Sequence, residues 1–193
     1  SVHGAWQPRT RGLGSLIDRT AWPRYRNPSQ VISGPTEWSR LLDDSKFLAE
    51  YEDVLASFDQ YVANGADHWF HQRYGKALSG PIAYFCAEYG LHESLGIYSG
   101  GLGVLAGDHM KSASDMALPA IGVGLLYRKG YFRQTIDADG HQEHNYPDYD
   151  LSRLPLSRVQ DASGLPLTVT VELPGRDLGV AVWLAQVGRV PVL

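Results

Sequence analysis

The 193-residue sequence predicts an α/β protein in which a helical segment, residues 1–80, precedes the beginning of a layered α/β unit, residues 81–193. Three observations carry this prediction. Apolar residues recur at three- and four-residue steps across residues 36–62, which is typical of amphipathic helices. Two short apolar runs flank a helical pattern between residues 81 and 128, as in parallel strands joined by a helix. Alternating stretches separated by turn residues follow, as in β-hairpins.

The helical segment is expected to contain several pieces. Residues 1–35 are rich in Pro, Arg and aromatic side chains, which predicts loops and short helices. Residues 36–62 predict one or two amphipathic helices that share a helix–helix core. Thr36 and Ser45 are candidate N-caps, and Asn64-Gly65 is a candidate left-handed end.

The hydrophobic pattern of the sequence changes after Pro81. The run IAYFCA predicts a buried strand, helical spacing follows from Leu102 to Ala117, and AIGVGLLY predicts a second buried strand. This order predicts a right-handed crossover between parallel strands. Asp139-Gly140 predicts a hairpin turn, and LTVTVEL and VAVWLAQV around PGRDLG predict a second hairpin.

Composition excludes several classes of function. A hydrophobic content of 44% and a charged content of 20% are those of a globular protein. The net charge of -4 and the lack of a Lys/Arg run argue against nucleic acid and anionic membranes as partners. No apolar run approaches the ~20 residues of a membrane span, and no signal-peptide core opens the chain. Cys86 is the single cysteine, which fits a reducing compartment, so we expect a cytoplasmic protein.

The stretch YSGGLGVLAGD, residues 98–108, is the strongest candidate site. Gly100, Gly101 and Gly103 form a glycine-rich turn that feeds directly into a helix. The first N–H groups of a helix lack internal partners and carry partial positive charge, so such a turn can bind a phosphate or a developing negative oxygen. The alternative is a tight turn with close helix–sheet packing, and the residues alone leave both explanations open.

Two other kinds of site are not favoured. The segment GLGVLA fits G-x-G-x-x-A and Arg128 ends the next strand, but a dinucleotide fingerprint follows its strand immediately, and EYGLHESLGIYS intervenes here. The pairs His68/His71 and His141/His144 lack a third ligand at familiar spacing, so we expect no metal site.

A long block of the chain resembles a known family. The block is IAYFCAEYGLHESLGIYSGGLGVLAGDHMKSASDMALPAIGVGLLYRKGYFRQTIDADGHQEHNYP, residues 82–147, followed by VWLAQVGRVPVL at residues 182–193. It is similar to the N-terminal catalytic region of α-glucan (glycogen/maltodextrin) phosphorylases. The similarity is strongest to the short bacterial branch, which carries an extra helical segment that residues 1–80 resemble more loosely.

This resemblance implies a two-lobed glycosyltransferase fold (GT-B), in which residues 81–193 begin the first Rossmann-like lobe. It implies reversible phosphorolysis of terminal α-1,4-glucosidic bonds of glycogen or maltodextrin, with orthophosphate as co-substrate and glucose 1-phosphate as product. It also implies pyridoxal phosphate, used through its phosphate group and bound by a lysine of the second lobe. No segment here resembles that lobe.

The resemblance also assigns site residues. Gly100, Gly101, Leu102 and Gly103 are expected to contact the glucosyl and phosphate groups. Glu88 matches an acidic residue near the family's catalytic site, and a role as a strand-end cap is the alternative. Tyr89 is followed by a glycine, whereas the glycogen branch has an aromatic pair here, so a cofactor contact of the second aromatic does not carry over.

The sequence stops at VGRVPVL, within an apolar, strand-like run, so we expect an N-terminal fragment that lacks phosphorylase activity by itself. Two alternatives remain. A nucleotide-sugar glucosyltransferase of the glycogen or starch synthase type shares the fold and the GGLG turn, but typically has Lys where Tyr98-Ser99 stands here. The other is a non-catalytic glucan-binding or interaction module.

Overall fold

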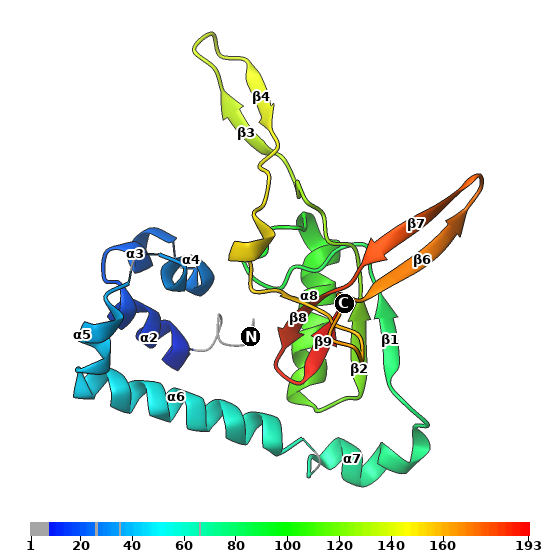
Figure 1. Ribbon diagram of the computed structural model, residues 1–193, viewed down its shortest axis with the longest axis horizontal. Helices are drawn as coiled ribbons and strands as arrows, with labels where there is room; N and C mark the ends of the chain where they lie inside the picture. The colour runs from blue at the N-terminus through cyan, green and yellow to red at the C-terminus, as the bar shows by residue number, and fades with distance from the viewer. Residues whose placement is uncertain (1–7, 26, 35, 66) are drawn as a thin grey trace.

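The computed structural model describes residues 8–25, 27–34, 36–65 and 67–193, and it has a helical part followed by a sheet part (Figure 1). This mixture confirms the predicted α/β class. Short helices lie within residues 8–32 as expected, while residues 1–7 of that prediction fall outside the described residues. The helical part consists of α2 (Pro8–Ile17), α3 (Ala21–Tyr25), α4 (Pro28–Ile32), α5 (Trp38–Leu42), α6 (Ser45–Ala63), α7 (Trp69–Tyr74) and the 3-10 turn η1 (Gly75–Ala77).

Both predicted N-caps are wrong by one residue. The N-cap of α5 is Glu37 rather than Thr36. The N-cap of α6 is Asp44 rather than Ser45, because the Asp44 carboxylate accepts hydrogen bonds from two N–H groups of the first turn. The left-handed end is also wrong: α6 stops where expected, but Asn64 has φ of -75°.

The predicted helix–helix core is wrong for most of α6. Leu13, Leu41 and Phe47 form a small buried cluster where the first turns of α6 meet α2 and α5. Beyond it, α6 extends as an arm toward α7 (Figure 1). Tyr51 is 45% exposed and Leu55 is 44% exposed on that arm.

The sheet part contains a five-stranded mixed sheet, order β1-β2-β9-β8-β5, and two separate hairpins. The predicted strand–helix–strand unit is confirmed, since β1 and β2 pair in parallel from Ile82↔Ala120 and α8 connects them. The elements are β1 (Ile82–Phe85), α8 (Gly100–Asp115), β2 (Ala120–Val123), β3 (Arg133–Ile136), β4 (Gln142–Asn145), η2 (Leu151–Arg153), β5 (Ser157–Arg158), β6 (Thr168–Leu173), β7 (Arg176–Ala181), β8 (Trp183–Val187) and β9 (Val190–Val192).

The predicted β3–β4 hairpin is confirmed, and the second hairpin is confirmed only in part. Its return strand β7 begins at Arg176, inside the predicted turn PGRDLG, and most of VAVWLAQV forms β8, which pairs with β5 and β9. β3 pairs antiparallel with β4, and β6 pairs antiparallel with β7. Both project from the sheet (Figure 1), and their strand residues are exposed.

The main core lies where α8 covers the sheet. Ala106, Met110 and Ala113 of α8 pack with Val187 and Val190 in one buried cluster. This core positions α8, and with it the glycine-rich segment at the amino end of the helix.

The predicted burial of the first two strands is wrong for β1 and holds only in part for β2. Phe85 is 75% exposed, because β1 is an edge strand of the described sheet and no described element covers its outer face. In β2, Gly122 is buried and its neighbours are half-buried. None of the described helices has both the length and the apolar character needed to cross a membrane.

Candidate functional site

The glycine-rich segment forms the first turn of α8 rather than a loop in front of it. The helix begins at Gly100, two residues earlier than the spacing predicts, with Ser99 as its N-cap. Gly100 has φ of +66°, a backbone conformation that favours glycine. The Ser99 side chain makes no capping hydrogen bond, so the cap comes from elsewhere in the chain.

That cap is Glu88, which lies in the segment between β1 and α8. Its Oε1 accepts a hydrogen bond from the Gly103 N–H at 3.0 Å, and its Oε2 accepts one from the Ser99 N–H at 3.2 Å. A carboxylate in this position satisfies helix donors and complements the positive end of the helix dipole. The structure thus brings Glu88 and the glycine-rich segment together and engages the Gly103 N–H.

The N–H groups of Gly101 and Leu102, also at the amino end of α8, are not capped by Glu88. Within the described chain, no hydrogen bond is recorded for the N–H groups of Gly101 and Leu102. Gly101 is exposed, and Leu102 is 56% exposed. The N–H groups of Gly101 and Leu102, like that of Gly100, are therefore open to an anionic or polar ligand.

Close packing accounts for Gly103 and Gly107. A Cβ atom on Gly103 would lie 2.7 Å from Tyr98 Cβ and 3.2 Å from Glu88 Oε1, and one on Gly107 would overlap the Gly90 carbonyl. The backbones also bond directly, since the Gly90 N–H donates to the Gly103 carbonyl at 2.7 Å. These glycines let the segment after β1 lie directly on α8.

Packing does not account for Gly101. Apart from its chain neighbours and the nearby backbone of α8, no atom would lie within 4 Å of a Cβ atom there, and the φ of Gly101 is outside the left-handed region. Gly100 is explained by its positive φ, and Gly103 by its neighbours. Neither close packing nor backbone conformation therefore requires a glycine at position 101.

The missing second aromatic now has an explanation. Tyr89 is buried, its hydroxyl donates to the Tyr84 carbonyl at 2.6 Å, and it accepts from the Val123 N–H at 3.1 Å. Burial raises the pKa of Tyr89 to about 12. The next residue, Gly90, lies against α8, where a Cβ atom would be 2.9 Å from the Gly103 carbonyl carbon. The sequence analysis missed the contact between Gly90 and α8, although Gly103 and Gly107, which lie four residues apart on one face of the helix, are a signal for it.

The segment that leads into α8 is a packed support. Leu91 and Leu95 are fully buried in the core. His92 Nδ1 accepts from the Ser94 N–H at 3.1 Å, and burial lowers the pKa of His92. This imidazole is therefore neutral near pH 7, and it closes a local turn.

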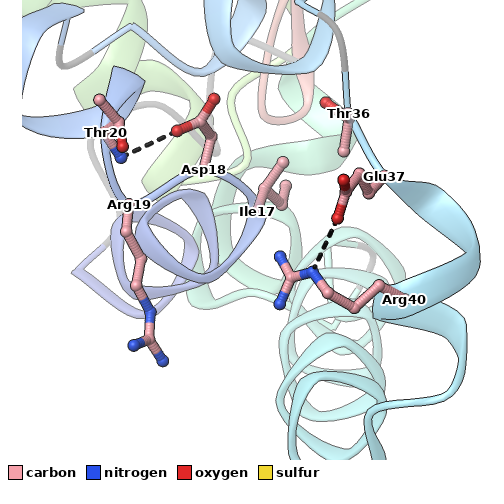
Figure 2. Close-up of a pocket in the computed structure, with 7 residues that line it drawn as sticks. All are labelled: Ile17, Asp18, Arg19, Thr20, Thr36, Glu37 and Arg40. Atoms are coloured by element: carbon pink, nitrogen blue, oxygen red, sulfur yellow. Dashed lines mark hydrogen bonds and ion pairs between the residues drawn. The ribbon is translucent and has the colours of Figure 1, made fainter.

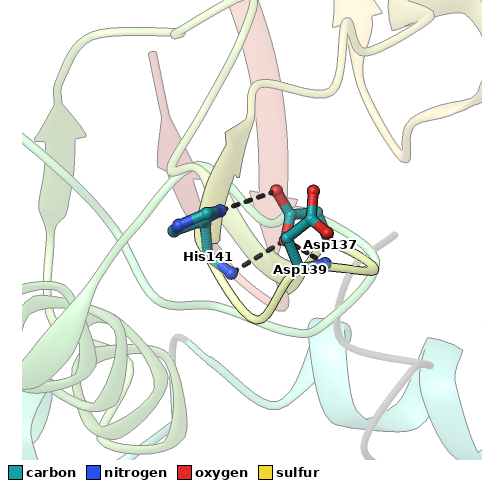
Figure 3. A group of neighbouring side chains, drawn as sticks. All are labelled: Asp137, Asp139 and His141. Atoms are coloured by element: carbon teal, nitrogen blue, oxygen red, sulfur yellow. Dashed lines mark hydrogen bonds and ion pairs between the residues drawn. The ribbon is translucent and has the colours of Figure 1, made fainter.

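A group of titratable side chains lies in the β3–β4 turn (Figure 3). Asp137 Oδ1 accepts from the N–H groups of Asp139 and His141 at 2.9 and 2.8 Å, and Asp137 Oδ2 lies 3.4 Å from His141 Nδ1. These are the contacts of an Asx turn, in which an aspartate holds the hairpin closed. The sequence analysis weighed His141 with His144 and missed Asp137 as its neighbour.

A cavity of about 450 Å³ lies in the helical part (Figure 2). It is lined by Ile17, Asp18, Arg19, Thr20, Thr36, Glu37 and Arg40. Asp18 accepts from the Thr20 N–H at 2.8 Å, and Glu37 pairs with Arg40 at 3.5 Å. The lining holds two cations and two carboxylates, so it offers no net charge that would select an anion or a cation.

Comparison with known proteins gives two family matches. A profile described as "Carbohydrate phosphorylase" matches residues 89–163, and one described as "Protein of unknown function (DUF3417)" matches residues 2–95.

The relatives extend over nearly the whole chain. A glycogen phosphorylase of Mycobacterium tuberculosis is 40% identical over 100% of this chain and 23% of its own length. A maltodextrin phosphorylase of Thermococcus litoralis is 39% identical over 96% of this chain and 22% of its own length. A glycogen phosphorylase of Aquifex aeolicus is 32% identical over 95% of this chain and 26% of its own length. The chain therefore spans about a quarter of the length of these curated relatives. No solved structure matches it significantly.

Proposed function

Because the chain belongs to the glycogen and maltodextrin phosphorylase family, we propose that it forms part of an enzyme that cleaves terminal α-1,4-glucosidic bonds of a glucan with orthophosphate and releases glucose 1-phosphate. The observation that carries this proposal is the identity of 40% over the entire chain, joined to a carbohydrate phosphorylase match that includes the glycine-rich segment. A glucan, orthophosphate and a cytoplasmic location follow from it as parts of the same proposal.

The fold assignment is part of the proposal. Residues 81–193 begin the first Rossmann-like lobe of a GT-B enzyme, and residues 1–80 form a helical extension. The parallel β1–α8–β2 unit supports the first statement. The end of η1 at Ala77 and the start of β1 at Ile82 support a boundary between residues 80 and 81.

The glycine-rich segment acts as a binding site in this proposal. The N–H groups of Gly101 and Leu102 donate to a phosphate or sugar oxygen, whose negative charge grows during bond cleavage. Donors held in place by a helix stabilise such charge without having to reorganise. Gly100 allows the backbone turn at the start of α8. The Gly103 N–H binds the Glu88 carboxylate. The Glu88 carboxylate binds the N–H groups of Ser99 and Gly103 and repels an anion from them. The N–H groups of Gly101 and Leu102 are then the donors left for the ligand.

Pyridoxal phosphate is the proposed cofactor, and its phosphate group supplies the acid–base partner for orthophosphate when it is bound. The lysines of this chain do not fit its attachment. Lys111 pairs with Asp108 at 3.7 Å on α8, and Lys46, Lys76 and Lys129 are exposed. The attachment lysine accordingly belongs to the second lobe of the family fold, and no residue here is assigned to the cofactor.

The proposed function is tested by activity and by cofactor content. A phosphorylase that carries residues 1–193 is expected to bind pyridoxal phosphate and to release glucose 1-phosphate from maltoheptaose and orthophosphate. Residues 1–193 alone are expected to do neither, because the reaction needs both walls of the cleft. Glucosyl transfer from a nucleotide sugar without pyridoxal phosphate would favour the synthase alternative, and retention on glucan without either activity would favour a binding module. Product release by residues 1–193 alone would contradict the two-lobe mechanism.

Glu88→Gln is expected to lower both stability and turnover. The carboxamide oxygen can accept from only one of the two N–H groups, and its NH₂ then faces the other donor. We expect a loss of about 1–3 kcal/mol in the free energy of unfolding, measured by urea denaturation of residues 1–193. Glu93→Gln is the control, since Glu93 is an exposed residue of the same connecting segment. Unchanged stability with lowered turnover would instead mean that Glu88 contacts the reacting groups directly.

A further inference from the structure

The helical part and the sheet part meet at the carboxyl end of α8. The Tyr61 hydroxyl of α6 lies 2.6 Å from Ser114 Oγ and donates to Asp115 Oδ1 at 2.9 Å. Arg189, in the turn between β8 and β9, donates from Nη1 to the Ser114 carbonyl at 2.6 Å and from its backbone N–H to Ser114 Oγ at 2.8 Å. Its Nη2 donates to the Tyr61 carbonyl. Tyr61, Ser114 and Arg189, here called the α8 clamp, thus join three elements.

The clamp is tightly packed. Ser114 is 1% exposed, and the Arg189 guanidinium carbon lies 3.9 Å from the centroid of the Tyr61 ring. A cation over an aromatic face gains electrostatic attraction, and the same guanidinium complements the negative carboxyl end of the helix. Burial raises the pKa of the Tyr61 hydroxyl, which therefore stays protonated and able to donate near neutral pH.

The helical part makes a second contact at the same end. His71 Nε2 of α7 lies 2.6 Å from the Ala117 carbonyl oxygen, just beyond the last turn of α8. Ala117 has φ of +53°, an uncommon conformation for a residue with a Cβ atom. Two helices of the extension therefore bond to the chain where α8 ends.

The core-facing side of α8 makes these end contacts important. Its buried residues are Gly103, Ala106, Gly107, Met110, Ala113 and Ser114. With Met110 as the one large side chain, this face has few projections that would fix the helix along its own axis. Hydrogen bonds are directional, so contacts at the two ends define that position. Glu88 and the Gly90 N–H provide them at the amino end, and the α8 clamp provides them at the carboxyl end.

We propose that the helical extension is a positioning module for the catalytic lobe. Through the α8 clamp it fixes the carboxyl end of α8, and so holds the Gly101 and Leu102 N–H groups in place about 18–20 Å away, the axial length of the 12 to 13 residues that separate them from Ser114. This gives a role to the segment whose family profile carries no assigned function. Tyr61, Ser114 and Arg189 are positioning residues. The consequence for catalysis rests on the proposed function, whereas the coupling along α8 does not.

The coupling is tested in residues 1–193 by amide hydrogen exchange followed by NMR. Tyr61→Phe keeps the ring beneath Arg189 but removes the hydroxyl, and Tyr51→Phe is the control on the exposed arm of the same helix. We expect exchange of the Gly103 N–H, which is bound to Glu88, to become about 3- to 10-fold faster in Tyr61→Phe, the factor that corresponds to one lost hydrogen bond. The Val123 N–H is the internal reference, since global destabilisation would accelerate both.

Equal acceleration at Gly103 and Val123, or no acceleration at Gly103, would overturn the proposal. If Tyr61→Phe does not fold, Asp115→Asn replaces it, because this variant keeps an oxygen acceptor for Tyr61 and is expected to have a smaller effect in the same direction. In a phosphorylase that carries this sequence, Tyr61→Phe is expected to raise KM for orthophosphate by about the same 3- to 10-fold. If exchange at Gly103 becomes faster but KM for orthophosphate does not rise, the coupling along α8 is supported and the proposed role of the glycine-rich segment is contradicted.

Discussion

Gly101→Ala is expected to lower phosphorolysis about 100-fold or more while the protein stays as stable as before. A methyl group at this position would stand where the ligand approaches, and it would displace that ligand from the Gly101 and Leu102 N–H groups. Loss of one aligned donor to a developing negative charge costs about 100- to 1,000-fold in turnover. Stability is expected to be unchanged or to rise by up to about 1 kcal/mol, because alanine is the better helix residue and its Cβ atom would meet no neighbour.

The two halves of this expectation are measured separately. Urea denaturation of residues 1–193 gives the stability, and the rate of glucose 1-phosphate release by a phosphorylase that carries the substitution gives the activity. Gly80→Ala is the matched control, because it adds the same methyl group at another glycine with open space around it. Near-normal turnover in a stable Gly101→Ala variant would rule out ligand approach at this glycine.

Gly107→Ala is expected to have the opposite signature, with a loss of about 3 kcal/mol or more in the free energy of unfolding. The added Cβ atom would overlap the carbonyl of Gly90, and both partners are backbone, so no side-chain rotation can relieve the overlap. Either the segment after β1 or α8 itself must move. That movement would also disturb the Glu88 bond to the Gly103 N–H.

Equilibrium urea denaturation checks this expectation, with Gly101→Ala as the comparison on the same helix. The two variants carry the same substitution six residues apart and differ in what the methyl group meets. A loss below about 1 kcal/mol for Gly107→Ala would mean that the approach of the two backbones is not required for folding.

The kinds of element and their order follow from local sequence. The β1–α8–β2 unit and the β3–β4 hairpin are predicted correctly, because the periods of helices and strands and the turn residue Gly140 act over a few positions. The second hairpin forms with a shorter turn than predicted, since β7 begins at Arg176. Burial does not follow in the same way. Phe85 lies in a run that is typical of a buried strand, yet it is exposed, since burial depends on which other elements cover the strand.

The same division holds at the candidate site. The sequence by itself singled out Glu88 and the four residues from Gly100 to Gly103, because glycine clusters before a helix are unusual and the surrounding block resembles a known family. It left two explanations of the glycines open. The tertiary structure accounts for Gly103 by packing and leaves ligand approach at Gly101 as a proposal, because this distinction depends on which atoms lie beside each Cβ position. Gly103 meets the segment after β1, and Gly101 meets nothing.

The α8 clamp was beyond sequence reasoning altogether. From the sequence, Tyr61 is one more member of an amphipathic stripe, Ser114 is a small residue of a helix, and Arg189 is one cation within an apolar, strand-like run. They lie 53 and 75 positions apart along the chain and meet only after α6, α8 and the β8–β9 turn have packed. Local periodicity carries no information about such a meeting, because it is fixed by how whole elements dock against one another.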